Sequence, residues 1–283
     1  PDFINHMMEN KWLGSKTKQG FYKKVDKDIL SLDLNTLEYR PQQKASFQTL
    51  ELTKTIDKVV DRFKVLVKGK DKAGDFYRKS FAGLFAYVSN RVPEITDDLY
   101  KIDDAMKAGF GWEHGPFQIW DAIGVETALE FMKEAGEKPA AWIEEMLASG
   151  NQSFYTVKEG ANYYYDIPSK SQKKVPGQDA FIILDNIRES KKVWGNSDVT
   201  LHNIGDGILN LEFHSKMNSI GGGVISGINK AIEIAEKEYE GLVIGNQGAN
   251  FSVGANLGMI FMMAVEQEYD ELNFAIKSFQ DTM

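Results

Sequence analysis

Between about Leu50 and Leu147 the apolar residues recur at the spacing of an amphipathic helix. In the first part of this stretch they fall at i, i+3, i+4 and i+7, which places them on one helical face. The residues of this face are Ile56, Val59, Val60, Phe63, Leu66 and Val67. Further helices are predicted near residues 73–90, 95–108, 116–134 and 139–149, because proline or aspartate stands near several starts and glycine near the ends. Residues 50–155 are therefore expected to form a mainly α-helical domain.

The last third of the chain has the short apolar runs that are typical of strands. These runs are Phe181–Leu184, Val199–His202, Ile208–Phe213 and Leu242–Ile244. The turn Gly205-Asp206-Gly207 predicts that the second and third runs form a hairpin. A helix is expected at about 221–239 and another from about 256, so the strands on either side of the first helix should be parallel. This part of the chain is expected to be α/β.

Two polar stretches separate these parts. Residues 23–46 are predicted to be an irregular linker, and residues 156–180 an inter-domain connector. Each follows a similar sequence, in which a helical segment ends at glycines and then at Phe-Tyr. The two endings are Gly14–Tyr22 and Met146–Tyr155. This internal repeat suggests a duplicated helical domain, the first copy of which is truncated here.

The stretch Glu240–Leu257 combines a buried strand, a glycine turn and a loop of small residues that opens a helix. Backbone N–H groups point outward at the start of a helix. There they are able to hold a carbonyl oxygen that gains negative charge during a reaction. This stretch is the strongest candidate for a chemical site.

Composition narrows the possible functions of the 283-residue chain. Its formal net charge of -8 argues against nucleic-acid binding, which needs concentrated Lys and Arg. It contains no cysteine, which removes disulfides and thiolate chemistry. We expect a cytoplasmic protein without a membrane span, since no signal peptide or long apolar run is present. The chain begins on Pro1 and stops 26 residues after Leu257, so we expect it to be an internal fragment of a larger enzyme.

Two parts of the sequence resemble families that occur together in one polypeptide. Residues 106–124, with GFGWEHGPF followed by Asp121 and Gly124, are similar to the helical C-terminal domain of 3-hydroxyacyl-CoA dehydrogenases. Gly14–Tyr22 resembles the end of the same domain. Residues 198–283 resemble the first part of the crotonase (enoyl-CoA hydratase/isomerase) fold, above all through Asn250–Leu257. The whole chain is similar to the middle of multifunctional β-oxidation enzymes in which the dehydrogenase precedes the hydratase.

The resemblance implies a multi-domain organisation, a mainly α N-terminal part followed by an incomplete crotonase-like ββα spiral. Its expected parts are the end of a first helical repeat (1–25), a linker (26–49), a second helical domain (50–155), a connector (156–180) and the crotonase-like part (181–283). It also implies acyl-CoA as the substrate and NAD as the cofactor of the parent enzyme.

The resemblance further implies which residues form the site. The backbone N–H of Ala255 would be one oxyanion donor, and Gly254, Ala255 and Asn256 would bind the substrate. Crotonases usually have Asp where this chain has Asn256. The NAD domain with its His–Glu pair would precede Pro1, and the hydratase glutamates and the second donor would follow Met283. We therefore expect the fragment to be inactive, without bound cofactor or metal.

Other motifs have structural interpretations. The glycines 221–223 do not match a dinucleotide fingerprint, because the sixth position is Ser226. The four histidines lack metal-ligand spacing, and His114 and Asp121 are expected to have local structural roles. Two alternatives stay open. One is a non-catalytic scaffold or homodimerisation module with a face formed by Phe76, Tyr77, Phe81, Phe85 and Tyr87. The other is an acyl-CoA-binding protein.

Overall fold

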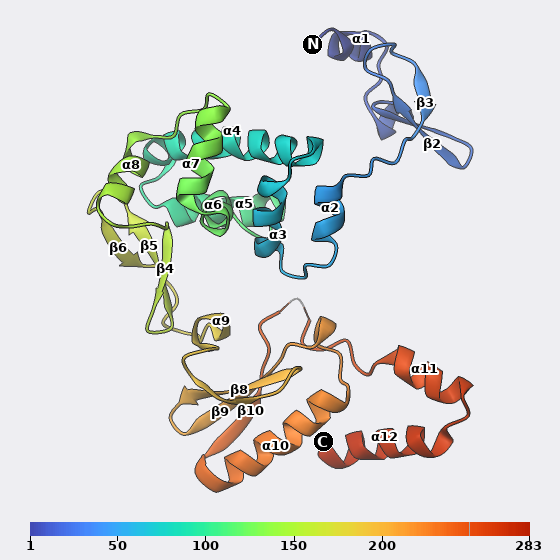
Figure 1. The fold of residues 1–283 in the computed structure, drawn as a ribbon, viewed down its shortest axis with the longest axis vertical. Helices are drawn as coiled ribbons and strands as arrows, with labels where there is room; N and C mark the ends of the chain where they lie inside the picture. Colours follow the sequence, from blue (N-terminus) through green and yellow to red (C-terminus); the bar gives the residue numbers. More distant parts are fainter. Residues whose placement is uncertain (249) are drawn as a thin grey trace. The chain divides into compact units, whose positions relative to one another are not determined.

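The computed structural model describes residues 1–248 and 250–283 (Figure 1). The chain divides into two compact units, residues 1–78 and 79–283, and the boundary falls within helix α4 (Lys72–Ile95). The N-terminal unit begins with α1 (Asp2–Glu9) and a short 3-10 turn (Ser15–Thr17). It continues through a small sheet to α2 (Gln48–Thr53) and α3 (Val59–Lys68).

Residues 23–46 were expected to be irregular, and this expectation is wrong. They contain most of a three-stranded antiparallel sheet of β1 (Tyr22–Val25), β2 (Asp28–Leu32) and β3 (Tyr39–Pro41). Its strands bury few side chains, so they lack the alternation of apolar and polar residues that identifies a strand in the sequence. Main-chain pairing and polar contacts hold the sheet instead. One such contact is the 2.6 Å hydrogen bond that the Tyr39 hydroxyl donates to the Gly20 carbonyl.

The helical part of the second unit follows the predicted order. It consists of the rest of α4 followed by α5 (Leu99–Phe110), α6 (Pro116–Ile123), α7 (Val125–Glu134) and α8 (Ala141–Ala148). The single helix expected over 116–134 is two helices, because Gly124 takes a φ of 103° that ends the first. Stacked aromatic rings fill the core, with the Phe85 ring 4.7 Å from that of Trp120. Phe154 packs edge-on against Trp120 at 5.1 Å.

The aromatic stripe that was suggested as a dimerisation face is not a single face. Phe81 and Phe85 are 9% and 0% exposed, so they belong to the core of the helical part itself. Phe76 and Tyr87 are 64% and 65% exposed. Phe81 and Phe85 therefore do not contribute to an exposed face.

Residues 156–180, expected to be a polar connector, also form most of a sheet. It contains β4 (Tyr155–Lys158), β5 (Ala161–Asp166) and β6 (Ser171–Lys174), paired antiparallel in chain order. Like the N-terminal sheet, it starts at the tyrosine of a Phe-Tyr pair and has a two-residue first turn, entered at positive φ by Asp26 in one sheet and Glu159 in the other. The shared arrangement supports the internal repeat, extended by a sheet that the sequence did not reveal.

The C-terminal part is α/β, as predicted. Its sheet has the order β10-β9-β8-β7, formed by β7 (Lys192–Gly195), β8 (Val199–Gly205), β9 (Ile208–Phe213) and β10 (Gly241–Ile244). The β8–β9 hairpin and the parallel β9–β10 pair are both confirmed. Helix α10 (Gly222–Glu238) makes the crossover (Figure 1). Its Val224, Ile228 and Ala231 pack with the buried strand residues.

One predicted strand is wrong. Residues 181–183 are not in a strand, and Leu184 begins the short helix α9 (Leu184–Ile187). Phe181 and Ile182 are 58% and 42% exposed, so an apolar run here does not mark a buried strand. Strand β7 was not predicted. It is an edge strand in which the consecutive residues Lys192 and Val193 are both exposed, so it lacks the alternation of apolar and polar residues that identifies a strand.

The chain ends with two helices after the loop that follows β10. The helix expected from about 256 is confirmed as α11 (Leu257–Val265), and α12 (Tyr269–Thr282) follows it. Neither helix has a buried residue, although α11 is strongly apolar. Within the described parts of the chain, no helix combines the length and apolarity needed to cross a membrane.

Candidate functional site

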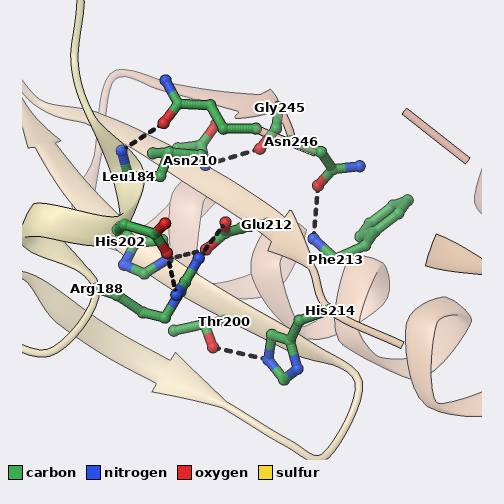
Figure 2. A network of polar contacts seen from close by, with 12 residues as sticks. Leu184, Arg188, Thr200, His202, Asn210, Glu212, Phe213, His214, Gly245 and Asn246 are labelled. Carbon is green, nitrogen blue, oxygen red and sulfur yellow. Dashed lines mark hydrogen bonds and ion pairs between the residues drawn. The ribbon is translucent and has the colours of Figure 1, made fainter. Parts of the chain in front are cut away.

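The loop between β10 and α11 is fixed at its start by side-chain amides. The Asn210 amide on β9 donates to the Gly245 carbonyl at 3.2 Å. Asn246 accepts from the Phe213 N–H at 2.6 Å and donates to the Phe251 carbonyl at 2.7 Å, so one side chain joins the end of β9 to the middle of the loop (Figure 2). Such bonds hold a loop in one conformation without burying it.

A second set of bonds holds the end of the loop, where the predicted site residues lie. The Ile220 N–H donates to the Gly254 carbonyl at 2.8 Å in an isolated parallel bridge. Gly254 has a φ of 84°, a conformation that glycine adopts without steric penalty. Among the residues that the structure describes, the N–H of Ala255 has no hydrogen-bond acceptor. It is therefore available to a ligand.

Ala255 lies on the wall of a pocket. Ala255 and Asn256 line a cavity of about 490 Å³ together with residues of α10, α11 and α12. Most of the other lining side chains are apolar, and they include Ile220, Ile225, Met259, Met263, Leu272 and Phe279. Of the three predicted substrate-binding residues, the structure thus places two on the pocket wall, while Gly254 does not line the cavity. The polar side chains on the cavity wall are those of Ser226, Asn229, Asn256, Glu271 and Ser278.

Asn256 also has a local structural role. Its side-chain oxygen accepts the N–H of Met259 at 3.2 Å, which is the N-cap interaction of α11. A neutral amide makes this cap as a carboxylate does, so the Asn in this position preserves the helix start.

A buried ion-pair network joins Glu212 on β9 to His202 on β8 and to Arg188, which follows α9. Glu212 on β9 is 3% exposed and accepts two hydrogen bonds from the Arg188 guanidinium, at 3.0 and 2.8 Å (Figure 2). His202 Nε2 lies 3.2 Å from the same carboxylate. Burial alone would raise the pKa of Glu212, but the bonds from His202 and Arg188 outweigh it and hold this pKa at about 2. Glu212 precedes Phe213, the residue whose N–H binds Asn246, so the network adjoins the anchor of the loop on β9.

Replacing Arg188 by Ala is expected to destabilise the protein by about 2 kcal/mol, because it removes two charge-assisted bonds and leaves a buried carboxylate. Chemical denaturation at pH 7 measures the loss. The matched control is Lys237→Ala, which removes an exposed ion pair with Glu233 and should cost less than about 0.5 kcal/mol. Equal effects of the two changes would contradict a supporting role for the network.

Two of the four histidines, His202 on β8 and His214 after β9, contact neighbouring residues of the sheet. His202 is fully buried, and His214 Nε2 lies 2.9 Å from the Thr200 hydroxyl, so each histidine of this pair contacts another residue (Figure 2). The described residues contain no group of three or more His, Cys, Asp or Glu side chains able to hold a metal ion.

In the helical part, two aspartates clamp the GPF segment and the Phe-Tyr segment together. Asp103 on α5 accepts the N–H groups of Phe117 and Gln118 at 2.9 and 3.0 Å, which caps α6 from outside its own chain segment. The Tyr155 hydroxyl donates to the same carboxylate at 2.8 Å. A methyl group on Gly115 would lie 2.3 Å from the Asp103 Cα, so only glycine allows this approach.

Asp121 was expected to have a local role, either bonding nearby backbone or capping the following segment, and this is wrong. Its carboxylate accepts the N–H groups of Phe154 and Tyr155, both at 2.8 Å and more than 30 residues away. Burial raises the pKa of Asp103 to about 6 and that of Asp121 to about 7, against the hydrogen bonds that favour ionisation. The sequence motif therefore marks a structural clamp, and it gave no indication of Asp103.

The glycine turn before α10 does not fit a nicotinamide cofactor. A methyl group on Gly223 would lie 1.9 Å from an Asp198 carboxylate oxygen, so this glycine allows close packing within the protein. We therefore derive no step through NAD from the described residues.

The sequence of the helical part matches a known domain family. Residues 81–164 match the family model of the 3-hydroxyacyl-CoA dehydrogenase C-terminal domain. This range contains Asp103, Asp121 and the Phe-Tyr pair, so the clamp belongs to a domain of that class.

The chain is also similar over its whole length to proteins with related names. It is 42% identical over 284 residues to a probable 3-hydroxyacyl-CoA dehydrogenase of Bacillus subtilis strain 168, covering 100% of this chain and 36% of the relative. It is 26% and 25% identical to provisionally named fatty acid oxidation complex trifunctional enzymes of Rickettsia felis and Rickettsia prowazekii, covering 99% of this chain and 35% of each relative. The chain thus spans about a third of the length of these relatives. No solved structure matches it significantly.

Proposed function

We propose that this chain is a section of a fatty acid β-oxidation enzyme that joins a 3-hydroxyacyl-CoA dehydrogenase to an enoyl-CoA hydratase/isomerase-like part of the crotonase fold. The dehydrogenase domain at residues 81–164 and the names of the relatives support the first half. The loop that presents the Ala255 amide, at the end of a β–α–β unit, supports the second. In this proposal NAD accepts hydride from a 3-hydroxyacyl-CoA and is held by residues outside 1–283, and the section itself has neither activity.

The observation that carries the second half is Ala255 on the wall of a mostly apolar pocket, with an N–H that has no acceptor among the described residues. We propose that it donates a hydrogen bond to the carbonyl oxygen of an acyl thioester, while the acyl chain lies against Ile225, Met259 and Met263. Addition of water to a 2,3-unsaturated thioester places negative charge on that oxygen. A fixed donor is most valuable there, and loss of one donor typically lowers kcat about 10²- to 10³-fold.

The proposal predicts that the amide responds to a thioester carbonyl. We expect the ¹H resonance of the Ala255 amide to move downfield when the ¹⁵N-labelled chain is titrated with hexanoyl-CoA, because a new acceptor reaches that proton. S-hexyl-CoA is the matched control, since it has the same chain and nucleotide but no carbonyl. An equal shift with both compounds, or no binding of either, would refute the assignment of Ala255.

The absence of dehydrogenase activity is tested separately. We expect no NADH formation when the chain is mixed with a 3-hydroxyacyl-CoA and NAD. Turnover at the rate of an ordinary enzyme, on the order of 10 s⁻¹, would refute the proposal that the cofactor site lies elsewhere.

A further inference from the structure

The hydroxyl of Ser252 joins the turn after β9 to the end of the site loop. It donates to the Asn218 carbonyl at 2.7 Å and accepts the N–H of Gly254 at 3.0 Å. We propose that Ser252 is a positioning residue that fixes Gly254 and so, together with the Ile220 N–H, sets the direction of the Ala255 amide. This inference rests on the proposed function of Ala255 and adds a residue to its site.

The argument starts from the freedom of Gly254. This residue has a φ of 84°, and no atom lies within 4 Å of the place where its Cβ would be. Side-chain packing therefore does nothing to fix it, and glycine has more conformational freedom to lose than any other residue. The orientation of the peptide groups on its two sides must come from hydrogen bonds.

Two bonds supply that orientation, one for each peptide group. Ser252 holds the N–H of Gly254, and the N–H of Ile220 holds the Gly254 carbonyl at 2.8 Å. The peptide bond between residues 254 and 255 is planar and trans, so its N–H points opposite to its carbonyl. With the carbonyl directed at Ile220, the Ala255 N–H is directed away from the bridge.

The residue that accepts the Ser252 hydroxyl, Asn218, lies in a turn with a strained backbone. Met217 and Asn218 both have a φ of 55°, which is uncommon for residues other than glycine. The Asn218 amide donates to the Asn250 carbonyl at 3.0 Å, so the turn and the loop are joined at two points. Strained residues persist where surrounding contacts determine their conformation. The Ser252 hydroxyl bonds both Asn218 and Gly254, so it connects this fixed turn to Gly254.

The inference is tested with Ser252→Ala, Ser252→Thr and the control Ser215→Ala. Ser215 donates its hydroxyl to the Ser219 carbonyl at 2.7 Å, which is the same kind of bond in the same turn without contact to Gly254. We expect Ser252→Ala to bind hexanoyl-CoA about fivefold to tenfold more weakly, as loss of one hydrogen bond implies. Binding of S-hexyl-CoA should change less than about twofold, Ser252→Thr should restore most of the affinity, and Ser215→Ala should behave as the unchanged protein.

A ligand-free measurement separates this inference from the proposed function. In ¹H–¹⁵N spectra, Ser252→Ala should shift the Gly254 and Ala255 amides and speed their hydrogen exchange, while amides of α10 stay in place and show that the fold is intact. Ser252→Thr should return both amides toward their original positions. Unchanged Gly254 and Ala255 amides in a folded Ser252→Ala variant would overturn the positioning role, whether or not any acyl-CoA binds. Equal weakening of hexanoyl-CoA and S-hexyl-CoA binding would overturn it as well.

Discussion

Replacing Asp103 by Ala is expected to lower the free energy of unfolding by about 3 kcal/mol. The change leaves three donors without their acceptor, the N–H groups of Phe117 and Gln118 and the hydroxyl of Tyr155. A buried donor that loses its partner costs about 1–3 kcal/mol, and relief of the buried carboxylate offsets part of the sum. Urea denaturation at pH 7, followed by tryptophan fluorescence, measures the effect because Trp120 and Trp142 lie in the same core.

Asp104→Ala is the matched control for this prediction. Asp104 is the next residue on α5, but its side chain is 60% exposed and pairs with Lys107 at 2.8 Å. Surface pairs of this kind contribute about 0–1 kcal/mol. If the two alanine variants unfolded at the same urea concentration, Asp103 would not be the clamp that its contacts indicate.

Stability is expected to fall as the pH rises from 5 to 7, because of Asp121. Burial raises the pKa of this carboxyl from 3.8 to about 7 in the folded protein. The folded state therefore holds a proton that the unfolded state releases above pH 4. The stabilisation is complete below the unfolded pKa and is lost as the pH passes through the folded one. Between these values the loss is about 1.4 kcal/mol for each pH unit.

The variant Asp121→Asn isolates this effect from the other titrating groups. An amide does not titrate, so the variant should lose the Asp121 part of the slope of unfolding free energy against pH between 5 and 7. Asp103 still contributes below about pH 6, since burial raises its pKa as well. Glu212 does not interfere, because its low pKa matters only in more acidic solution. The same slope in both proteins would show that Asp121 has an ordinary pKa.

The sequence predicted those elements that have one buried, apolar face and one exposed, polar face. The helices from 50 to 149 and the strands β8, β9 and β10 show clear apolar periods, and the hairpin and the parallel pair followed from them. The small sheets at 22–41 and 155–174 were missed, because cross-strand backbone bonds build them and their exposed faces tolerate polar residues. The run at 181–183 was wrongly predicted to be a strand, because its residues are apolar although Phe181 and Ile182 are exposed.

The candidate site was predictable only where a resemblance singled out its residues. Ala255 and Asn256 were named from the loop sequence, and both line the pocket. Ser252, Asn246 and Arg188 were not, because each acts through a partner distant in the sequence. Asp103 was missed for the same reason, since nothing near it in the chain indicates that α6 begins beside it.

The clamp also limits how such a protein is able to evolve by recombination. Asp121 accepts hydrogen bonds that the Phe-Tyr segment donates. Asp103 contacts both the GPF segment and Tyr155. A crossover between two genes that fell inside this interval would bring together halves shaped in different ancestors. The block from Asp103 to the sheet that begins at Tyr155 should therefore be inherited whole, with gene junctions tolerated before or after it.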